Sequence, residues 1–179
     1  GGGPGGSMAA LHAAKNDIKV CVLEKTRDIG YPVRCGEAIG EQAVKQFFEP
    51  KDSWIATTIK KCRIISPNGT IVKIPFKKEH GYVLNRRIFD YDLSLMASQK
   101  GAEFYTKAYV QSIEKKKDGY HVHVEHLGES KIISSKILIG ADGLDSRVGR
   151  WAGIRTQVKM KDLESCVQYS VGNIDIDIN

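Results

Sequence analysis

The sequence predicts an α/β fold with a parallel sheet, and three observations lead to this prediction. Glycines 1, 3 and 6 precede a run of small residues that extends with helical character to residue 15. An apolar run over residues 18–24 reads as a buried parallel strand and ends in Glu24. A second apolar run, residues 137–139, breaks into the loop Gly140-Ala141-Asp142-Gly143. Buried strands that end at glycine turns and helices are typical of a Rossmann-like nucleotide-binding domain.

The glycine turn has the G-x-G-x-x-G spacing of a dinucleotide-binding motif. In that motif Gly1 makes the tight turn, Gly3 lets the backbone approach a pyrophosphate, and Gly6 allows close helix–strand contact. The helix N-terminus favours the negative charge. Glu24 would direct its carboxylate at a ribose hydroxyl pair, which suits a nucleotide without a 2′-phosphate, so FAD or NAD.

The same glycines allow a plainer interpretation, in which Gly1 to Ser7 form a flexible linker before Met8. The helix, strand and acid that follow favour the nucleotide-binding turn. The strand that should precede Gly1 is absent and no Met stands there. We therefore expect a fragment that is trimmed at its front.

The rest of the chain alternates between helical and strand patterns. The turn Pro67-Asn68-Gly69 between two alternating runs predicts a β-hairpin. An apolar stripe predicts a helix that Gly101 ends. We expect helices at 4–15, 37–48, 86–100 and 146–151, and strands at 18–24, 60–66, 70–76, 103–114, 119–126, 130–139 and 163–178.

Composition excludes several classes of function. The formal net charge is +6, but the lysines are scattered without aromatic interleaving, so we expect no nucleic-acid binding. The charges fit a solvated surface, or alternatively attraction to an anionic membrane or a phosphorylated substrate. No apolar run approaches about 20 residues and no signal peptide is visible, which predicts a soluble or peripheral protein.

Four widely spaced cysteines indicate neither a zinc site nor a disulfide framework, and they suit a reducing cytoplasm. His121, His123 and Glu125 alternate along one predicted strand. Polar residues in that pattern are usually a solvent-facing row, so we expect no metal site.

Six sequence blocks together resemble the geranylgeranyl reductase family. The block Pro-Val-Arg-Cys-Gly-Glu and the ending Arg-Trp-Ala-Gly are most similar to the archaeal digeranylgeranylglycerophospholipid reductases. Aromatic hydroxylases, halogenases and other FAD enzymes share the first glycine motif and the Gly-Ala-Asp-Gly loop, so the block at 30–38 discriminates best. The blocks that carry the resemblance are residues 1–7, 22–25, 30–38, 81–90, 101–103 and 140–153.

The resemblance implies a Rossmann-like FAD-binding domain with an inserted β-rich substrate region. Residues 1–179 would be a partial domain that lacks its first strand and C-terminal part. Residues 50–82 would contribute a hairpin to the substrate region, and residues 163–179 would begin the substrate-domain sheet.

The resemblance also implies the FAD-binding residues. The pyrophosphate would lie over the glycine turn, the adenosine ribose at Glu24, the flavin along the 34–38 block, the diphosphate region at Arg86 and the adenine at the Val110 backbone, and Asp142 would close the groove. The full set is Gly1, Gly3, Gly5, Gly6, Glu24, Arg34, Cys35, Gly36, Ala38, Arg86, Val110 and Asp142.

Some of these residues have structural alternatives. Cys35 is a candidate proton donor or redox group, but a free cysteine is often a small buried residue. Arg86 at a helix start is unfavourable unless an anion lies nearby, which favours anion binding over a plain surface charge. Asp142 fits either a turn before Gly143 or a ligand site after a buried strand.

The resemblance implies an FAD-dependent reductase that saturates C=C bonds of geranylgeranyl chains in archaeal-type ether lipids. Its partners would be a prenylated glycerophospholipid, an electron donor such as ferredoxin or NAD(P)H, and the inner face of the membrane. The alternatives are an FAD-dependent monooxygenase or a non-catalytic flavin-binding fragment. We expect this fragment itself to be inactive, because the family's later Gly-Asp segment and its tunnel-lining domain are missing.

Overall fold

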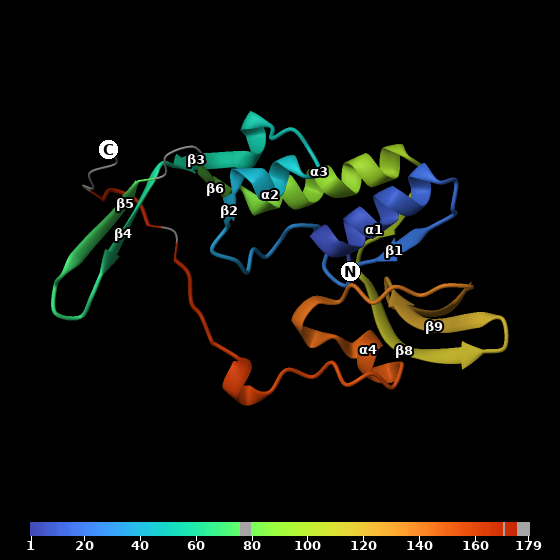
Figure 1. The fold of residues 1–179 in the computed structure, drawn as a ribbon. Coiled ribbons are helices and arrows are strands. Elements are labelled where there is room, and N and C mark those ends of the chain that lie inside the picture. Colours follow the sequence, from blue (N-terminus) through green and yellow to red (C-terminus); the bar gives the residue numbers. More distant parts are fainter. Residues whose placement is uncertain (76–79, 170, 175–179) are drawn as a thin grey trace.

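The computed structural model describes residues 1–75, 80–169 and 171–174. Its centre is a parallel strand pair with two helices beside it (Figure 1). Strand β1 (Cys21–Leu23) pairs with β7 (Glu103–Tyr105), and helix α1 (Pro4–Lys15) packs against α3 (Arg86–Gln99). Both helices have their predicted positions to within one residue, whereas β1 is shorter than the predicted 18–24.

Small side chains fill the core beneath the two helices. The fully buried residues there are Ala10, Leu11, Ala14, Val22, Ala97 and Ala102. Alanines at the contact let the helix backbones approach closely, which explains the small-residue run after the glycine turn. Gly101 adopts φ +99° directly after Lys100, the C-cap of α3, so a left-handed residue ends the helix as predicted.

A second sheet is formed by three strands between residues 38 and 84. Strand β6 (Gly81–Leu84) lies between β2 (Ala38–Gly40) and β3 (Ile55–Ile59), and all pairs are antiparallel. The predicted helix at 37–48 is therefore wrong in its first part, because residues 38–40 pair with β6. Only α2 (Glu41–Lys45) is helical there. A short 3₁₀ turn, η1 (Asp52–Trp54), leads into β3.

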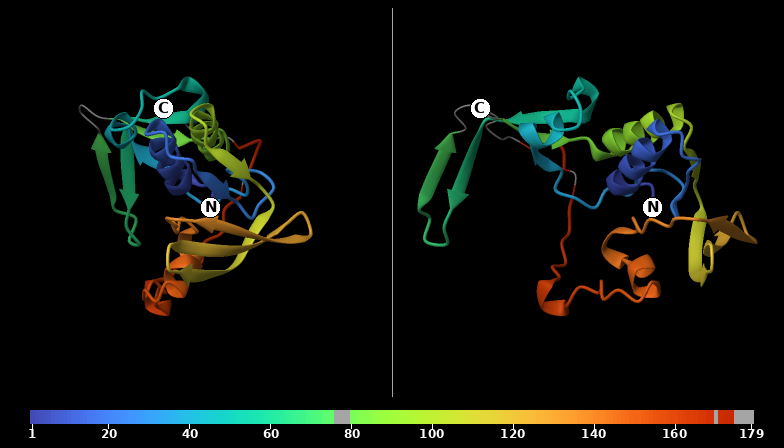
Figure 2. Two further views of the ribbon diagram at one scale, coloured as in Figure 1. Left: turned by 90° about the vertical axis from the view of Figure 1, so that its right-hand side faces the viewer. Right: turned by 45° about the vertical axis from the view of Figure 1, so that its right-hand side comes forward.

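The predicted hairpin is confirmed. Strands β4 (Lys61–Ile65) and β5 (Ile71–Pro75) pair antiparallel about the Pro67-Asn68-Gly69 turn. The hairpin projects away from the rest of the molecule in every view (Figures 1 and 2). Residue 76, the predicted end of its second strand, lies outside the described residues.

A third sheet lies on the other side of the two helices in Figure 1. It consists of β8 (Ala108–Lys116), β9 (Gly119–His126) and β10 (Glu129–Ser135), with β9 in the middle. The predicted strand at 103–114 divides into β7 and β8, because Lys107 between them adopts a left-handed backbone with φ +52°. Ala108, Val122 and Val124 form the core of this sheet.

Residues 137–139 do not form the predicted buried strand. The side chain of Ile137 is 76% exposed and that of Ile139 is 58% exposed. An extended segment becomes a strand only beside a hydrogen-bonded neighbour, and within the described residues no strand pairs with this one. The chain continues into η2 (Gly143–Asp145) and the short helix α4 (Arg147–Trp151), which lies where a helix is predicted.

The end of the chain differs from its prediction. After η3 (Met160–Asp162), residues 163–169 and 171–174 form no strand, although their alternation predicts one. Val167 and Tyr169 are more than three-quarters exposed, so the described residues do not bury the apolar side of this alternating pattern. The rest of the predicted strand, at residue 170 and from 175, lies outside the described residues.

Candidate functional site

Helix α1 begins in the glycine turn, and two of the glycines there are required by packing. A Cβ atom on Gly6 would overlap the carbonyl oxygen of Gly1, and one on Gly1 would overlap that of Ala141. The turn thus lies directly against the loop that follows residue 139. Only glycine permits this approach of one backbone to another.

Gly3 and Gly5 differ from these packed glycines. A Cβ on either would meet no atom within 4 Å, so the surrounding protein does not require glycine at these two positions. Gly3 is the N-cap of α1, and the first turn carries no acidic side chain. The positive end of the helix dipole therefore faces open space, which suits an anion.

Glu24 follows β1 and fastens it to the glycine turn. Its Oε2 accepts a hydrogen bond from the Gly2 N–H at 2.7 Å, and its Oε1 accepts two from Thr26, each at 2.8 Å. Burial alone would raise the pKa of this carboxyl, but the three hydrogen bonds to its charged form prevail and lower it. The carboxylate lies where the sequence predicts it, at the end of a strand beside the turn.

A pocket of about 320 Å³ opens beside this turn. Its walls come from the glycine turn, the end of β1, the loop that follows, the start of α3 and the loop before α4. The lining residues are Gly2, Gly3, Pro4, Glu24, Lys25, Thr26, Gly30, Tyr31, Pro32, Val33, Arg34, Cys35, Arg86, Asp90 and Gly143. The structure therefore brings Gly3, Glu24, Arg34, Cys35 and Arg86 together from four separate parts of the sequence.

Arg86 reaches the pocket already paired. Its Nε and Nη2 donate to the two carboxylate oxygens of Asp90, at 2.7 and 2.9 Å. These bonds raise the pKa of Arg86, and a weaker contribution comes from the Cys35 thiol beside it. Asp90 is 6% exposed and was missed by the sequence analysis, although an acid four residues after a helix-start arginine is a readable signal.

Cys35 lies at the surface of the pocket wall. The structural alternative of a buried cysteine does not apply, because the residue is exposed. Its Sγ accepts a hydrogen bond from the Glu37 N–H at 3.3 Å. Gly36 faces open space, and Ala38 pairs with Val83 in the second sheet. The 35–38 block thus joins the pocket to β2.

Asp142 and Val110 do not line the pocket. Asp142 accepts a hydrogen bond from the Val148 N–H at 2.9 Å, which holds the start of α4 against the 140–143 loop. Its Cα would lie 3.7 Å from a Cβ on Gly1, so it borders the glycine turn. Val110 packs against the core of the third sheet, near the point where Ala108 N–H donates to the Glu24 carbonyl.

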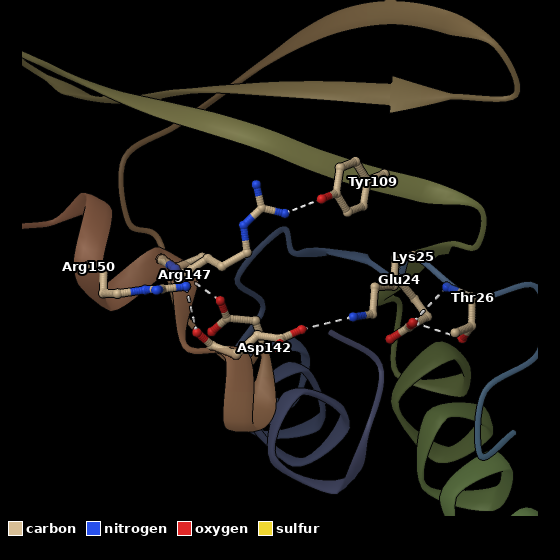
Figure 3. A network of polar contacts seen from close by, with 9 residues as sticks. Glu24, Lys25, Thr26, Tyr109, Asp142, Arg147 and Arg150 are labelled. Carbon is tan, nitrogen blue, oxygen red and sulfur yellow. Dashed lines mark hydrogen bonds and ion pairs between the residues drawn. The ribbon is translucent and has the colours of Figure 1, made fainter. Parts of the chain in front are cut away.

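A polar network ties α4 to both sides of the site (Figure 3). Lys25, next to Glu24, forms an ion pair with Asp145 at 3.1 Å. Arg147 donates to the Tyr109 hydroxyl, and its guanidinium lies over the rings of Tyr109 and Trp151. The network keeps the loop with Gly143 beside the end of β1.

The described part of the chain contains neither a cluster of metal ligands nor a membrane-spanning helix. There, no three His, Cys, Asp or Glu side chains come close enough together to hold a metal ion. None of the helices found among those same residues is both long enough and apolar enough to cross a membrane.

With this geometry in place, comparison with known proteins decides the family. The family described as "FAD binding domain" matches residues 1–175. The chain belongs to this FAD-binding family. FAD is the cofactor, and several related structures were determined with FAD bound.

Several curated relatives of this FAD-binding chain come from archaea. A digeranylgeranylglycerophospholipid reductase from Methanococcoides burtonii is 44% identical, over 99% of this chain and 45% of the relative. The reductase of the same name from Methanocaldococcus jannaschii is 37% identical, over 98% of this chain and 45% of the relative. The chain thus spans about half the length of the curated relatives that it matches.

Solved structures give the same fold. A geranylgeranyl bacteriochlorophyll reductase-like protein from Thermoplasma acidophilum superposes with a TM-score of 0.82 at 34% identity, covering 89% of this chain and 42% of that one. A flavin-dependent brominase superposes with a TM-score of 0.69 at 20% identity, covering 86% and 40%. At this lower identity the likeness shows the fold alone.

The residues of the pocket fit the cofactor. The open glycines at the helix start suit a pyrophosphate, and the carboxylate of Glu24 keeps one lone pair, on Oε2, beyond those that Gly2 and Thr26 occupy. Arg34 and Lys25 add positive charge at the rim. A dinucleotide in this pocket would meet donors where it is anionic and an acceptor where it carries hydroxyls.

Proposed function

We propose that the full-length protein is an FAD-dependent reductase that saturates C=C bonds in the geranylgeranyl chains of archaeal-type ether lipids. The observation that carries this proposal is the 44% identity, over nearly the whole chain, to a relative named digeranylgeranylglycerophospholipid reductase. The pocket supports it, because its lining includes residues of the discriminating 30–38 block.

The proposed cofactor contacts follow from the walls of the pocket. Gly3 and the first turn of α1 would face the pyrophosphate, together with Gly1, Gly5 and Gly6 of the same turn. Glu24 would accept from the ribose hydroxyls. Arg86, held flat by Asp90, would direct its remaining N–H groups at the diphosphate.

The flavin and adenine contacts are also part of the proposal. Arg34, Cys35, Gly36 and Ala38 would lie along the flavin. Val110 would offer its backbone to the adenine from a position outside the pocket lining. Asp142 would act indirectly, because its carboxylate holds α4 and the loop that borders the turn.

Bound reduced FAD supplies a hydride to one carbon of an isolated alkene, and a proton must reach the other carbon. Cys35 is the proposed proton donor, because its thiol is exposed at the pocket wall. Loss of that proton leaves a thiolate beside the Arg86 guanidinium and the Glu37 N–H, and both of these groups stabilise the negative charge. Such a donor acts only if the pocket positions the alkene and excludes water.

The test uses the full-length protein with bound flavin, reduced anaerobically and mixed with a geranylgeranyl glycerophospholipid. Flavin reoxidation with two hydrogens gained per double bond, measured by mass spectrometry, supports the reductase. Reoxidation that requires oxygen contradicts it and favours a monooxygenase. Bound flavin that no lipid and no oxygen reoxidises favours a binding module. Reduction by ferredoxin and by NAD(P)H, compared side by side, identifies the electron donor.

A lipid substrate implies contact with a membrane, and we propose that the β4–β5 hairpin makes it at the inner, cytoplasmic face. Six cationic residues and no acidic one lie between positions 60 and 78. By register, one face of the hairpin is apolar, and the other carries the cations Lys61, Arg63 and Lys73 beside Ile65, Ile71 and Pro75. The apolar face consists of Cys62, Ile64, Val72 and Ile74.

An anionic bilayer fits this amphipathic hairpin, because lipid accepts the apolar face while cations bind the headgroups. Sedimentation of the full-length protein with phosphatidylglycerol vesicles tests it. Arg63→Glu with Lys73→Glu should abolish binding, whereas Lys115→Glu with Lys117→Glu, on the third sheet, should not. Equal binding by both double variants would contradict the assignment.

A further inference from the structure

Glu37 has an uncommon backbone for a residue with a side chain. Its φ is +63°, in the left-handed region that normally favours glycine. Gly36, directly before it, does not use this region and faces open space. The position that needs left-handed backbone therefore carries a glutamate, although a glycine stands next to it. Such conformations persist only where the surroundings hold them, and they concentrate at functional sites.

Three hydrogen bonds hold Glu37. Its carbonyl oxygen accepts from the Leu84 N–H at 2.9 Å, at the end of β6. Its Oε1 accepts from the Arg86 N–H at 3.2 Å, at the first residue of α3. Its own N–H donates to the Cys35 Sγ at 3.3 Å. Glu37 thus connects the loop that lines the pocket to the end of β6 and to the first residue of α3.

The carboxylate also suits the helix start. The first N–H groups of a helix lack partners within the helix, and negative charge is favourable there. The Asn85 side chain accepts from Ile88, and Glu37 satisfies Arg86. Arg86 is the residue whose guanidinium lines the pocket beside the Cys35 thiol. One residue therefore contacts two pocket groups, because its side chain accepts from the Arg86 backbone N–H and its own backbone N–H donates to the Cys35 thiol.

We infer that Glu37 is a positioning residue that locks the 35–38 turn to the start of α3, so that Cys35 and Arg86 form one wall of the pocket. Its importance for cofactor binding rests on the proposed function. Its contact with the Cys35 thiol does not rest on that function, and its effect on the thiol can be measured without flavin.

The experiment follows alkylation of Cys35 by iodoacetamide across a pH series. It uses full-length protein in which Cys21, Cys62, Cys166 and any cysteine beyond this chain are serine, because these three are exposed as well. The variants are Glu37→Ala, Glu37→Gly and Glu37→Gln. Asp17→Ala is the matched control, since Asp17 is also an acid in left-handed backbone, at φ +58°, but follows α1 away from the pocket.

Glu37→Ala and Glu37→Gly should slow alkylation at pH 7 at least threefold, because the thiol loses its aligned N–H and its place beside Arg86. Glu37→Gln keeps the Oε1 acceptor and should retain the wild-type profile, as should Asp17→Ala. Glu37→Gly relieves the backbone strain, so it reports on the side chain even if Glu37→Ala does not fold.

Wild-type alkylation in Glu37→Gly would overturn the inference, because the backbone alone would then suffice. The inference would also be overturned if Glu37→Gln slowed the alkylation of Cys35 threefold, as much as Glu37→Ala does. FAD titration of the same proteins separates the two proposals. A wild-type protein that binds no FAD refutes the flavin site and leaves the alkylation result unaffected.

Discussion

The Oε2 of Glu24 accepts a hydrogen bond from the backbone N–H of Gly2 at 2.7 Å, and this bond joins the end of β1 to the turn before α1. Thr26 occupies the other carboxylate oxygen. The acid that the sequence assigns to a ribose is therefore also part of the turn that would hold the pyrophosphate. Its loss should affect both the fold and the cofactor.

Glu24→Ala removes three hydrogen bonds to a charged acceptor and leaves the Gly2 N–H without a partner. We expect a loss of about 2 kcal/mol in the free energy of unfolding, measured by urea denaturation. FAD affinity should fall more than tenfold. Glu24→Gln keeps one acceptor oxygen and should lie between wild type and Glu24→Ala in both measurements.

The lowered pKa of Glu24 gives a pH dependence with a definite sign. A carboxyl whose folded pKa lies below its ordinary 4.5 stabilises the fold fully above that pH, and loses this contribution as the pH falls through the folded pKa. Urea unfolding at a series of pH values should therefore show the stability gap between wild type and Glu24→Gln closing below pH 4.5. A gap that widens there would contradict the hydrogen-bond assignment.

Gly6 and Gly5, both in α1, should respond in opposite directions to alanine. A Cβ on Gly6 would overlap the Gly1 carbonyl oxygen, so Gly6→Ala should unfold the turn and lower the melting temperature sharply. A Cβ on Gly5 meets nothing, and alanine within a helix is more stable than glycine by about 0.5–1 kcal/mol. Gly5→Ala should therefore melt at the wild-type temperature or above it.

Asp90→Ala should be strongly destabilising. It leaves the Arg86 guanidinium, whose side chain is only 24% exposed, without its bidentate partner. Breaking a pair of this kind from one side costs about 3 kcal/mol, which chemical denaturation can measure. Glu129→Ala, on β10, removes an acid that is exposed and whose partner Lys131 is half exposed, and should cost less.

Trp54, the last residue of η1, lies in the core beside the second sheet, together with Val44, Tyr82 and Leu84. It is fully buried, packs edge-on against Phe48 and Phe89, and donates its Nε1–H to Asp92 at 2.8 Å. Trp54→Ala should cost about 3–5 kcal/mol. Trp54→Phe keeps most of the packing and should recover part of that loss in the same unfolding assay.

The sequence predicted the elements that local chemistry determines. Gly101 ended α3, Pro67 to Gly69 turned the hairpin, and the glycine spacing placed α1 and Glu24. The prediction from sequence failed where pairing with a distant segment decides whether a strand forms. Residues 38–40 became a strand because β6 lies beside them, and residues 137–139 have an apolar strand pattern without a paired neighbour in the described chain.

The residues of the candidate site also divide into those that the sequence predicted and those that it did not. Gly3, Glu24, Arg34, Cys35 and Arg86 were assigned to the cofactor from sequence, and the fold brings them to one pocket. Their roles toward FAD remain predictions. Asp90 was missed although its spacing from Arg86 is a readable signal. The three bonds of Glu37 were not predictable, because they depend on how the 35–37 turn approaches the start of α3.

Gly3→Ala tests the central claim most directly. The backbone of Gly3 has φ −68°, which alanine adopts freely, and a Cβ there meets no protein atom. Alanine in place of glycine at an N-cap should change the free energy of unfolding by less than about 1 kcal/mol. The measurement is FAD titration of the full-length wild type and Gly3→Ala, followed by flavin fluorescence. We predict at least tenfold weaker FAD binding with an unchanged melting temperature of the apoprotein. Equal FAD affinity in the two proteins would show that the pyrophosphate does not lie at this turn.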